Sequence, residues 1–160
     1  MKKILIISAY YAPKIHVASN RAMAIAKYLK KSGFDVTVLS EFSGPELVKQ
    51  SADQGINVVY LDGRHFLNRG SFFKKAGFPA HQLKTLKNKI LNFFVADDMP
   101  GFYLSFKKLW SSRRLDQWVD LREFDLMLST FAPLSCHLIG LEIKRNFPKI
   151  IWIADFRDEM

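Results

Sequence analysis

The sequence contains very little cysteine, and its few histidines are scattered. Cys136 is the one cysteine among 160 residues, and it has no Cys-x-x-Cys companion. A single thiol cannot form an intramolecular disulfide, so the composition favours a reducing compartment. The histidines show no spacing typical of metal ligands, and we therefore expect no bound metal. They are His16, His65, His81 and His137.

Long hydrophobic runs are also absent. A membrane-spanning helix needs about 18 consecutive apolar residues, and no stretch approaches that length. The first residues, MKKILIISAYYAP, place two lysines before an apolar run as a secretory signal does, but the run from Ile4 to Ile7 is too short for one. We expect a cytoplasmic protein, and attachment to the inner face of the membrane stays open.

Two glycine-rich phosphate-binding motifs are missing as well. The loop after the first apolar run contains neither G-x-G-x-x-G nor G-x-x-x-x-G-K-[ST]. Dinucleotide binding and P-loop phosphotransfer are therefore disfavoured, and we expect no cofactor. The length and the hydrophobic fraction of 49% fit one folded domain over residues 1–160.

What the sequence does contain is a localised positive charge. The net charge is +9, and the segment from Arg64 to Arg114 holds eleven Lys and Arg against two acids, an excess equal to that of the whole chain. Such an excess predicts an anionic partner. Phenylalanines interleaved with the cations suit an acidic membrane surface. Nucleic acid is disfavoured because no recognition motif supports it.

Apolar runs alternate with segments of helical periodicity along the chain. The runs predict strands at 2–10, 34–40, 56–63, 124–130 and 149–154. The periodic segments predict helices at 20–33, 81–95, 100–119 and 133–147, the first capped by Ser19 or Asn20 and stopped at Gly33. Residues 44–55 read as a weak short helix or a loop. The alternation predicts an α/β, Rossmann-like open parallel sheet with helices on both faces.

In such a sheet, ligands bind beyond the carboxyl ends of the strands. Three polar segments follow apolar runs there: Ser8–Asn20, Ser129–Pro133 and Asp155–Glu159. The helix start with Arg21 suits a diphosphate, although Arg21 could equally be a solvated side chain. His137 follows Pro133 within the next helix, where a lone histidine is more often a satisfied surface group. Carboxylates flanking Arg157 could bind sugar hydroxyls or form a structural ion-pair cluster.

Three motifs occur in one order: ILIISAYYAPKIHVASNRAMAIAKYLKKSGFDVTVLS, FDLMLSTFAPLSCHLIGLEIKRNF and IIWIADFRDEM. Together they resemble the N-terminal half of group 1 (family 4) glycosyltransferases. That family has a Tyr/Phe-x-Pro loop before a helix with an early Arg, a turn from Ser to Pro with a downstream His, and a strand closing with Asp-x-Arg-Asp. The resemblance covers residues 3–40 and 124–158. The first loop departs from it, because KIHVAS lacks the Gly-Gly pair of many members.

The resemblance implies the GT-B fold, in which two Rossmann-like domains face each other across a cleft. Residues 1–160 would form the N-terminal, acceptor-side domain of a truncated protein that is inactive alone, with the nucleotide-sugar-binding C-terminal domain absent. The implied activity is retaining transfer of a hexosyl-type sugar from a nucleotide-sugar donor. The acceptor would be a glycan or a lipid-linked glycan in cell-surface polysaccharide biosynthesis, and neither a cofactor nor a metal is implied.

The resemblance also implies roles for individual residues. The donor diphosphate would lie against His16, Ser19, Asn20 and Arg21. The acceptor would lie against Ser129, Pro133, His137, Asp155, Arg157 and Asp158, with His137 and Asp155 as candidate catalytic residues. The alternative function is a non-catalytic domain that binds an anionic membrane surface through its basic, aromatic-rich segment.

Overall fold

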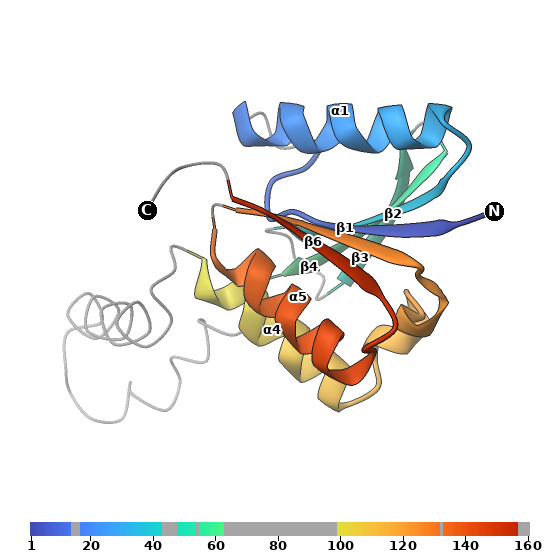
Figure 1. The fold of residues 1–160 in the computed structure, drawn as a ribbon. Helices are drawn as coiled ribbons and strands as arrows, with labels where there is room; N and C mark the ends of the chain where they lie inside the picture. Colours follow the sequence, from blue (N-terminus) through green and yellow to red (C-terminus); the bar gives the residue numbers. More distant parts are fainter. Residues whose placement is uncertain (14–16, 43–47, 54, 63–98, 132, 157–160) are drawn as a thin grey trace, which may run out of the picture.

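The computed structural model describes residues 1–13, 17–42, 48–53, 55–62, 99–131 and 133–156. They form a six-stranded sheet of order β3-β4-β2-β1-β5-β6 with helices on both faces (Figure 1). The strands are β1 (Lys3–Ile7), β2 (Asp35–Phe42), β3 (Val48–Asp53), β4 (Ile56–Asp62), β5 (Leu126–Thr130) and β6 (Ile151–Asp155). The α-helices are α1 (Val17–Lys31), α4 (Pro100–Ser111) and α5 (Ser135–Asn146), and the 3-10 helices η2 (Leu115–Gln117) and η3 (Leu121–Glu123) precede β5.

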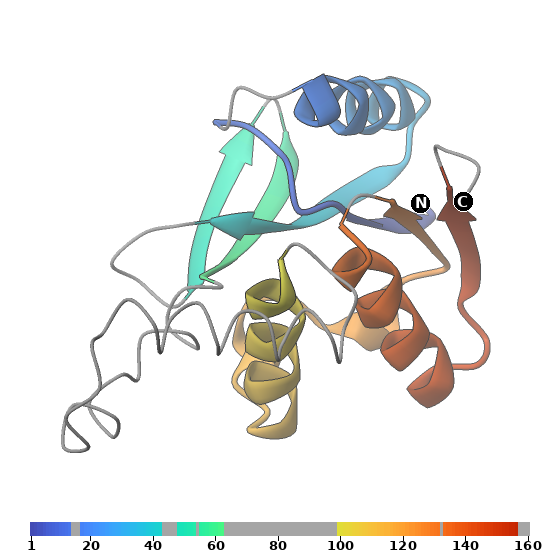
Figure 2. The ribbon, with the colours of Figure 1, turned by 90° about the vertical axis from the view of Figure 1, so that its left-hand side faces the viewer.

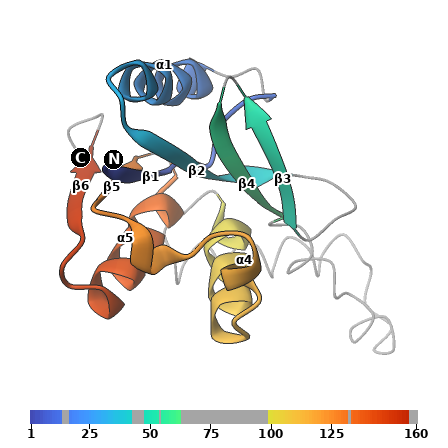
Figure 3. The same cartoon turned by 90° about the vertical axis from the view of Figure 1, so that its right-hand side faces the viewer.

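Five of the strands run parallel, so the predicted Rossmann-like α/β fold is confirmed. Helix α1 covers one face of the sheet, whereas α4 and α5 lie together on the other face (Figures 2 and 3). The connection from β1 to β2 and the connection from β5 to β6 run toward opposite sides of the sheet. Right-handed crossovers therefore place α1 and α5 on opposite faces.

Strand β1 lies at the centre of the sheet and is buried on both faces. Leu5 and Ile7 belong to the hydrophobic cluster that includes residues of α4 and α5, whereas Ile4 and Ile6 belong to the cluster beneath α1. A continuous apolar run is what a strand covered on both sides requires. This double burial explains why the apolar run forms the central strand of the sheet.

The structure corrects three of the predicted elements. Residues 48–53, predicted as helix or loop, form β3, which pairs antiparallel with β4 at the edge of the sheet. Helix α1 begins at Val17, so Ser19 and Asn20 lie inside its first turn and neither is its cap. Helix α4 ends at Ser111 rather than near residue 119. The helix predicted at 81–95 lies outside the described residues.

Candidate functional site at the carboxyl edge of the sheet

Three neighbouring parallel strands, β1, β5 and β6, bring their carboxyl ends to one edge of the sheet. The register pairs Ile7 of β1 with Ser129 of β5, and Thr130 of β5 with Asp155 of β6. The loops that follow these strands therefore start side by side. This edge holds most of the described residues for which the sequence predicts a role in binding.

The first of these loops is anchored to its surroundings through its backbone. The Ala9 N–H donates to Cys136 Sγ of α5 at 3.3 Å. The hydroxyl of Tyr60 on β4 donates to the carbonyl of Ala12, and Ser8 Oγ donates to the carbonyl of Tyr10 at 2.9 Å. The loop is therefore tied to both faces of the sheet, which holds its backbone close to the strand ends.

Ser129, His137 and Trp152 form a hydrogen-bonded group beneath this edge. Ser129 Oγ lies 2.7 Å from His137 Nδ1, and Trp152 Nε1 donates to the same oxygen at 2.9 Å. Ser129 is fully buried and His137 nearly so. The three side chains come from β5, α5 and β6, so their meeting depends on the packing of α5 against both strands.

The His137 ring is enclosed by aromatic side chains. Its centroid lies 4.4 Å from that of Phe156 and 5.7 Å from that of Phe131. Nε2 is buried and has no hydrogen-bond partner among the described residues. Burial lowers the pKa of His137 below its ordinary value, and the nearby charge of Asp155 acts in the opposite direction. The ring is therefore neutral at pH 7.

Arg21 and Asp155 form an ion pair beside this group. Arg21 Nη2 donates to Asp155 Oδ1 at 2.8 Å, which joins the start of α1 to the end of β6. The Arg21 side chain is 50% exposed and that of Asp155 only 19%, so ligand can reach the guanidinium directly. The second carboxylate oxygen, Oδ2, is buried without a partner in the described part of the chain. The exposed group of this ion pair is therefore the Arg21 guanidinium, and the Asp155 carboxylate lies behind it.

The edge therefore presents a defined set of polar groups. Because the hydroxyl of Ser129 is engaged, two polar atoms lack a described partner, Nε2 of the neutral imidazole and Oδ2 of Asp155, and both are buried. Part of the Arg21 guanidinium is exposed beside them. Imidazole and carboxylate bind hydroxyl groups, and guanidinium binds phosphate oxygens. A ligand that carries both hydroxyls and a phosphate fits this combination.

The structure brings some predicted residues together and separates others. Ser129 and His137 are in contact, and Pro133 is buried just before α5. Arg21 is predicted to bind the donor diphosphate and Asp155 the acceptor, and the structure bonds the two side chains to each other. Ser19 is fully buried, whereas Asn20 is exposed. Predictions for His16, Arg157 and Asp158 lie outside the described residues. The functional roles of all these residues stay predictions.

Sequence reasoning missed three residues of the site: Trp152, Phe131 and Phe156. Trp152 stands within an apolar strand and reads there as a core residue. Its neighbours Ile151 and Ile153 are exposed, so Trp152 is the residue of β6 that faces α5. A glycine on the facing helix, Gly140, is the signal that could have indicated a large ring in contact with it.

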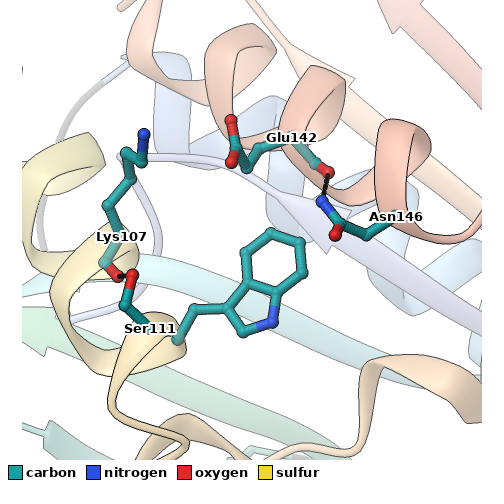
Figure 4. Close-up of a pocket in the computed structure, with 5 residues that line it drawn as sticks. Lys107, Ser111, Glu142 and Asn146 are labelled. Atoms are coloured by element: carbon teal, nitrogen blue, oxygen red, sulfur yellow. Dashed lines mark hydrogen bonds between the residues drawn. The ribbon is translucent and has the colours of Figure 1, made fainter.

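A second concave surface lies between α4 and α5, away from the carboxyl ends of the strands. It has a volume of about 200 Å³ and is lined by Lys107, Trp110, Ser111, Glu142 and Asn146 (Figure 4). Ser111 Oγ donates to the carbonyl of Lys107, and Asn146 Nδ2 donates to the carbonyl of Glu142. Two of its polar side chains are thus engaged with the backbones of their own helices, and the groove offers few groups for a ligand.

The described residues show neither a metal cluster nor a membrane span. No group of three or more His, Cys, Asp or Glu among them is placed to hold a metal ion. No helix in the described ranges is long and apolar enough to cross a bilayer.

Comparison with known proteins identifies a fold. No family model and no curated protein matches the chain. Its structure is similar to sucrose-phosphate synthase from Thermosynechococcus elongatus, with a TM-score of 0.56 and 12% sequence identity over 99% of this chain and 33% of that one. A structure described as trehalose-6-phosphate from E. coli bound with UDP-2-fluoro glucose has a TM-score of 0.45 and 12% identity over 91% of this chain and 30% of that one, too low to carry an argument. The chain thus spans a third of the synthase and shares its Rossmann-like fold.

Proposed function

We propose that the chain is the acceptor-side domain of a glycosyltransferase of GT-B fold. The observation that carries the proposal is the meeting of Arg21, Asp155 and the Ser129–His137 pair at the carboxyl edge of a parallel sheet. Those residues belong to the three motifs that resemble group 1 glycosyltransferases. Fold similarity to a sucrose-phosphate synthase agrees with this reading. The nucleotide-sugar-binding half would be a second domain that this sequence does not contain.

In this proposal each group at the edge has a chemical role. The exposed part of the Arg21 guanidinium pairs with the diphosphate of a nucleotide-sugar, while Asp155 Oδ1 holds it in place. His137 and Asp155 Oδ2 bind sugar hydroxyls, because a neutral imidazole and a carboxylate suit that task. The retaining, hexosyl-type reaction and the glycan or lipid-linked acceptor rest on the sequence resemblance alone.

Turnover of a natural protein that contains these residues together with a second domain tests the proposal. Arg21→Ala and Asp155→Asn should each lower kcat/KM by about tenfold or more, since a hydrogen bond to a charged group is worth about 1.5–3 kcal/mol. The matched control is Arg122→Ala, which breaks the Arg122–Asp120 ion pair. This pair lies just before β5, at the amino ends of the strands. Equal turnover of all three variants would refute the assignment of the site.

A second candidate function is attachment to an anionic membrane surface. Four of the basic residues lie in the described region, on α4 and the turn after it, and all four are exposed: Lys107, Lys108, Arg113 and Arg114. Trp118, which follows them, is 37% exposed. A cationic cluster with an exposed aromatic suits the surface of an acidic bilayer.

Sedimentation with vesicles distinguishes this candidate. The chain should bind vesicles of acidic phospholipid at low salt and release them at high salt, because the Debye length falls to about 3 Å at 1 M ionic strength. Reversing Lys107 and Lys108 to Glu should weaken binding, while reversing Lys27 and Lys31 on α1 should not. If neither pair of charge reversals weakens binding, or if neutral vesicles bind as well as acidic ones, the cationic surface of α4 is not the membrane-binding surface.

A further inference from the structure

We propose that Trp152, seated against Gly140, is a positioning residue that holds His137 in one tautomer, with the ring proton on Nε2. The arrangement itself follows from contacts within the chain, and its consequence for turnover rests on the proposed function. Both residues lie within the quoted motifs, but the resemblance assigns a role to neither of them.

The first step is the hydrogen bonding of one hydroxyl. Ser129 Oγ carries one proton and two lone pairs, whereas an indole N–H can only donate. Trp152 Nε1 lies 2.9 Å from that oxygen and occupies one lone pair. Among the described residues, His137 Nδ1 at 2.7 Å is the acceptor available to the hydroxyl proton. If Ser129 donates to Nδ1, Nε2–H is the one group of the trio left without a described partner, whereas the other tautomer would leave both the hydroxyl hydrogen and Nε2 without one. The ring proton is therefore on Nε2.

The second step is the seat of the indole. A Cβ added to Gly140 would lie 2.9 Å from both Cε2 and Nε1 of Trp152, closer than real Cβ atoms approach. The atom in contact, Nε1, is the same one that donates to Ser129. Glycine inside a helix costs about 0.5–1 kcal/mol relative to alanine, so its presence in α5 calls for a packing reason. The close approach of the indole supplies that reason.

The third step is what the arrangement gives a ligand. With Nδ1 engaged as an acceptor, the ring has a single N–H at Nε2, which is buried without a described partner in a ring that contacts Phe131 and Phe156. That donor suits the oxygen of a sugar hydroxyl. The indole N–H polarises the hydroxyl, which makes Ser129 Oγ a stronger donor to Nδ1 and a weaker acceptor from it. Without Trp152 this bias is lost, and both the other tautomer and the imidazolium become easier to form. The indole thus acts on the ligand through His137.

Long-range ¹H–¹⁵N NMR of the His137 ring tests the inference on this chain. The wild-type ring should show an unprotonated Nδ1 and a protonated Nε2, with His137→Gln identifying the signals. Trp152→Phe keeps the packing but deletes the donor, and should make the two nitrogen shifts converge and raise the pKa of His137. Gly140→Ala should act in the same direction. The control is Trp110→Phe, since the Trp110 indole stacks on Phe147 and makes no described hydrogen bond.

The outcomes separate this inference from the proposed function. A protonated Nδ1 in the wild type, or ring shifts unchanged by Trp152→Phe, overturns the inference whatever the activity. In the two-domain protein, Trp152→Phe should lower kcat/KM about two- to tenfold, the range expected for one neutral hydrogen bond. If the ring shifts change as expected and turnover does not, the tautomer arrangement stands and the role of His137 in transfer falls.

Discussion

At the scale of single residues, the site is a set of contacts between segments distant in sequence. Arg21 and Asp155 are 134 positions apart, and they meet because β6 lies beyond β5 in the sheet. The sequence indicates that polar residues follow the strands, which places them on one edge. It does not reveal strand order, so it could not predict that Arg21, assigned to the donor diphosphate, would pair with Asp155, assigned to the acceptor.

His137 should make the stability of the fold depend on pH. Burial lowers its folded-state pKa below the unfolded value, which is about 6.5, so the unfolded chain binds more protons between the two values. The free energy of unfolding should therefore fall as the pH drops through about 6.5, and the loss stops growing below the folded pKa.

Denaturant titrations of wild type and His137→Gln between pH 5 and pH 8 measure this contribution. The difference between the two curves should shrink as the pH falls, because the glutamine carries no proton to be taken up. Asp155→Asn should make the free energy of unfolding depend more steeply on pH than in the wild type. The substitution removes the charge that raises the pKa of His137 against the effect of burial. A pH-independent difference would contradict the burial argument.

At the scale of elements, the strands with apolar runs were predictable and the edge strand was not. The runs of β1, β2, β4, β5 and β6 are apolar enough to be recognised without their partners. In contrast, β3 has the sequence VKQSAD, whose polar residues resemble a loop. Its strand conformation comes from backbone pairing with β4, an interaction that the side-chain pattern does not encode.

Two helices end in the same hydrogen-bonding motif with different residues at its left-handed position. At the end of α1, Gly33 has φ +85°, and the N–H of Phe34 donates to the carbonyl of Leu29. At the end of α4, Arg113 has φ 53°, and the N–H of Arg114 donates to the carbonyl of Leu109. This is the Schellman motif, which favours glycine. It also explains why α4 ends eight residues earlier than its periodicity predicts.

Arg113→Gly should therefore stabilise the protein. A non-glycine residue in the left-handed region destabilises the folded state by about 1–2 kcal/mol. Glycine removes this strain, but it loses more backbone entropy on folding, which offsets about 0.5–1 kcal/mol of the gain. We expect a net gain of about 0.5–1 kcal/mol in the free energy of unfolding, measured by denaturant titration. The control is Arg114→Gly at the next position, where φ is −78° and glycine should destabilise. A loss at position 113 equal to that at 114 would refute the strain argument.

At the scale of the whole molecule, the two outermost strands of the sheet, β3 and β6, differ in character. One is closed by the polar, antiparallel β3. The other is β6, and no described strand pairs with its outer side. Ile151 and Ile153 of β6 are 61% and 48% exposed, and Phe156 beyond it is 56% exposed. An apolar edge strand with open backbone groups is a template for association between molecules.

The 160-residue chain should therefore self-associate through β6 as its concentration rises. Ile153→Lys should raise the concentration at which light scattering first detects oligomers, because a charge on an edge strand disfavours pairing. Tyr28→Lys is the matched control: it adds the same charge at a residue of α1 that is 71% exposed and about two helical turns beyond Arg21, which pairs with Asp155 of β6. If both variants delay association equally, the cause is net charge. If Ile153→Lys alone delays it, the edge is responsible, and its apolar side chains explain the association.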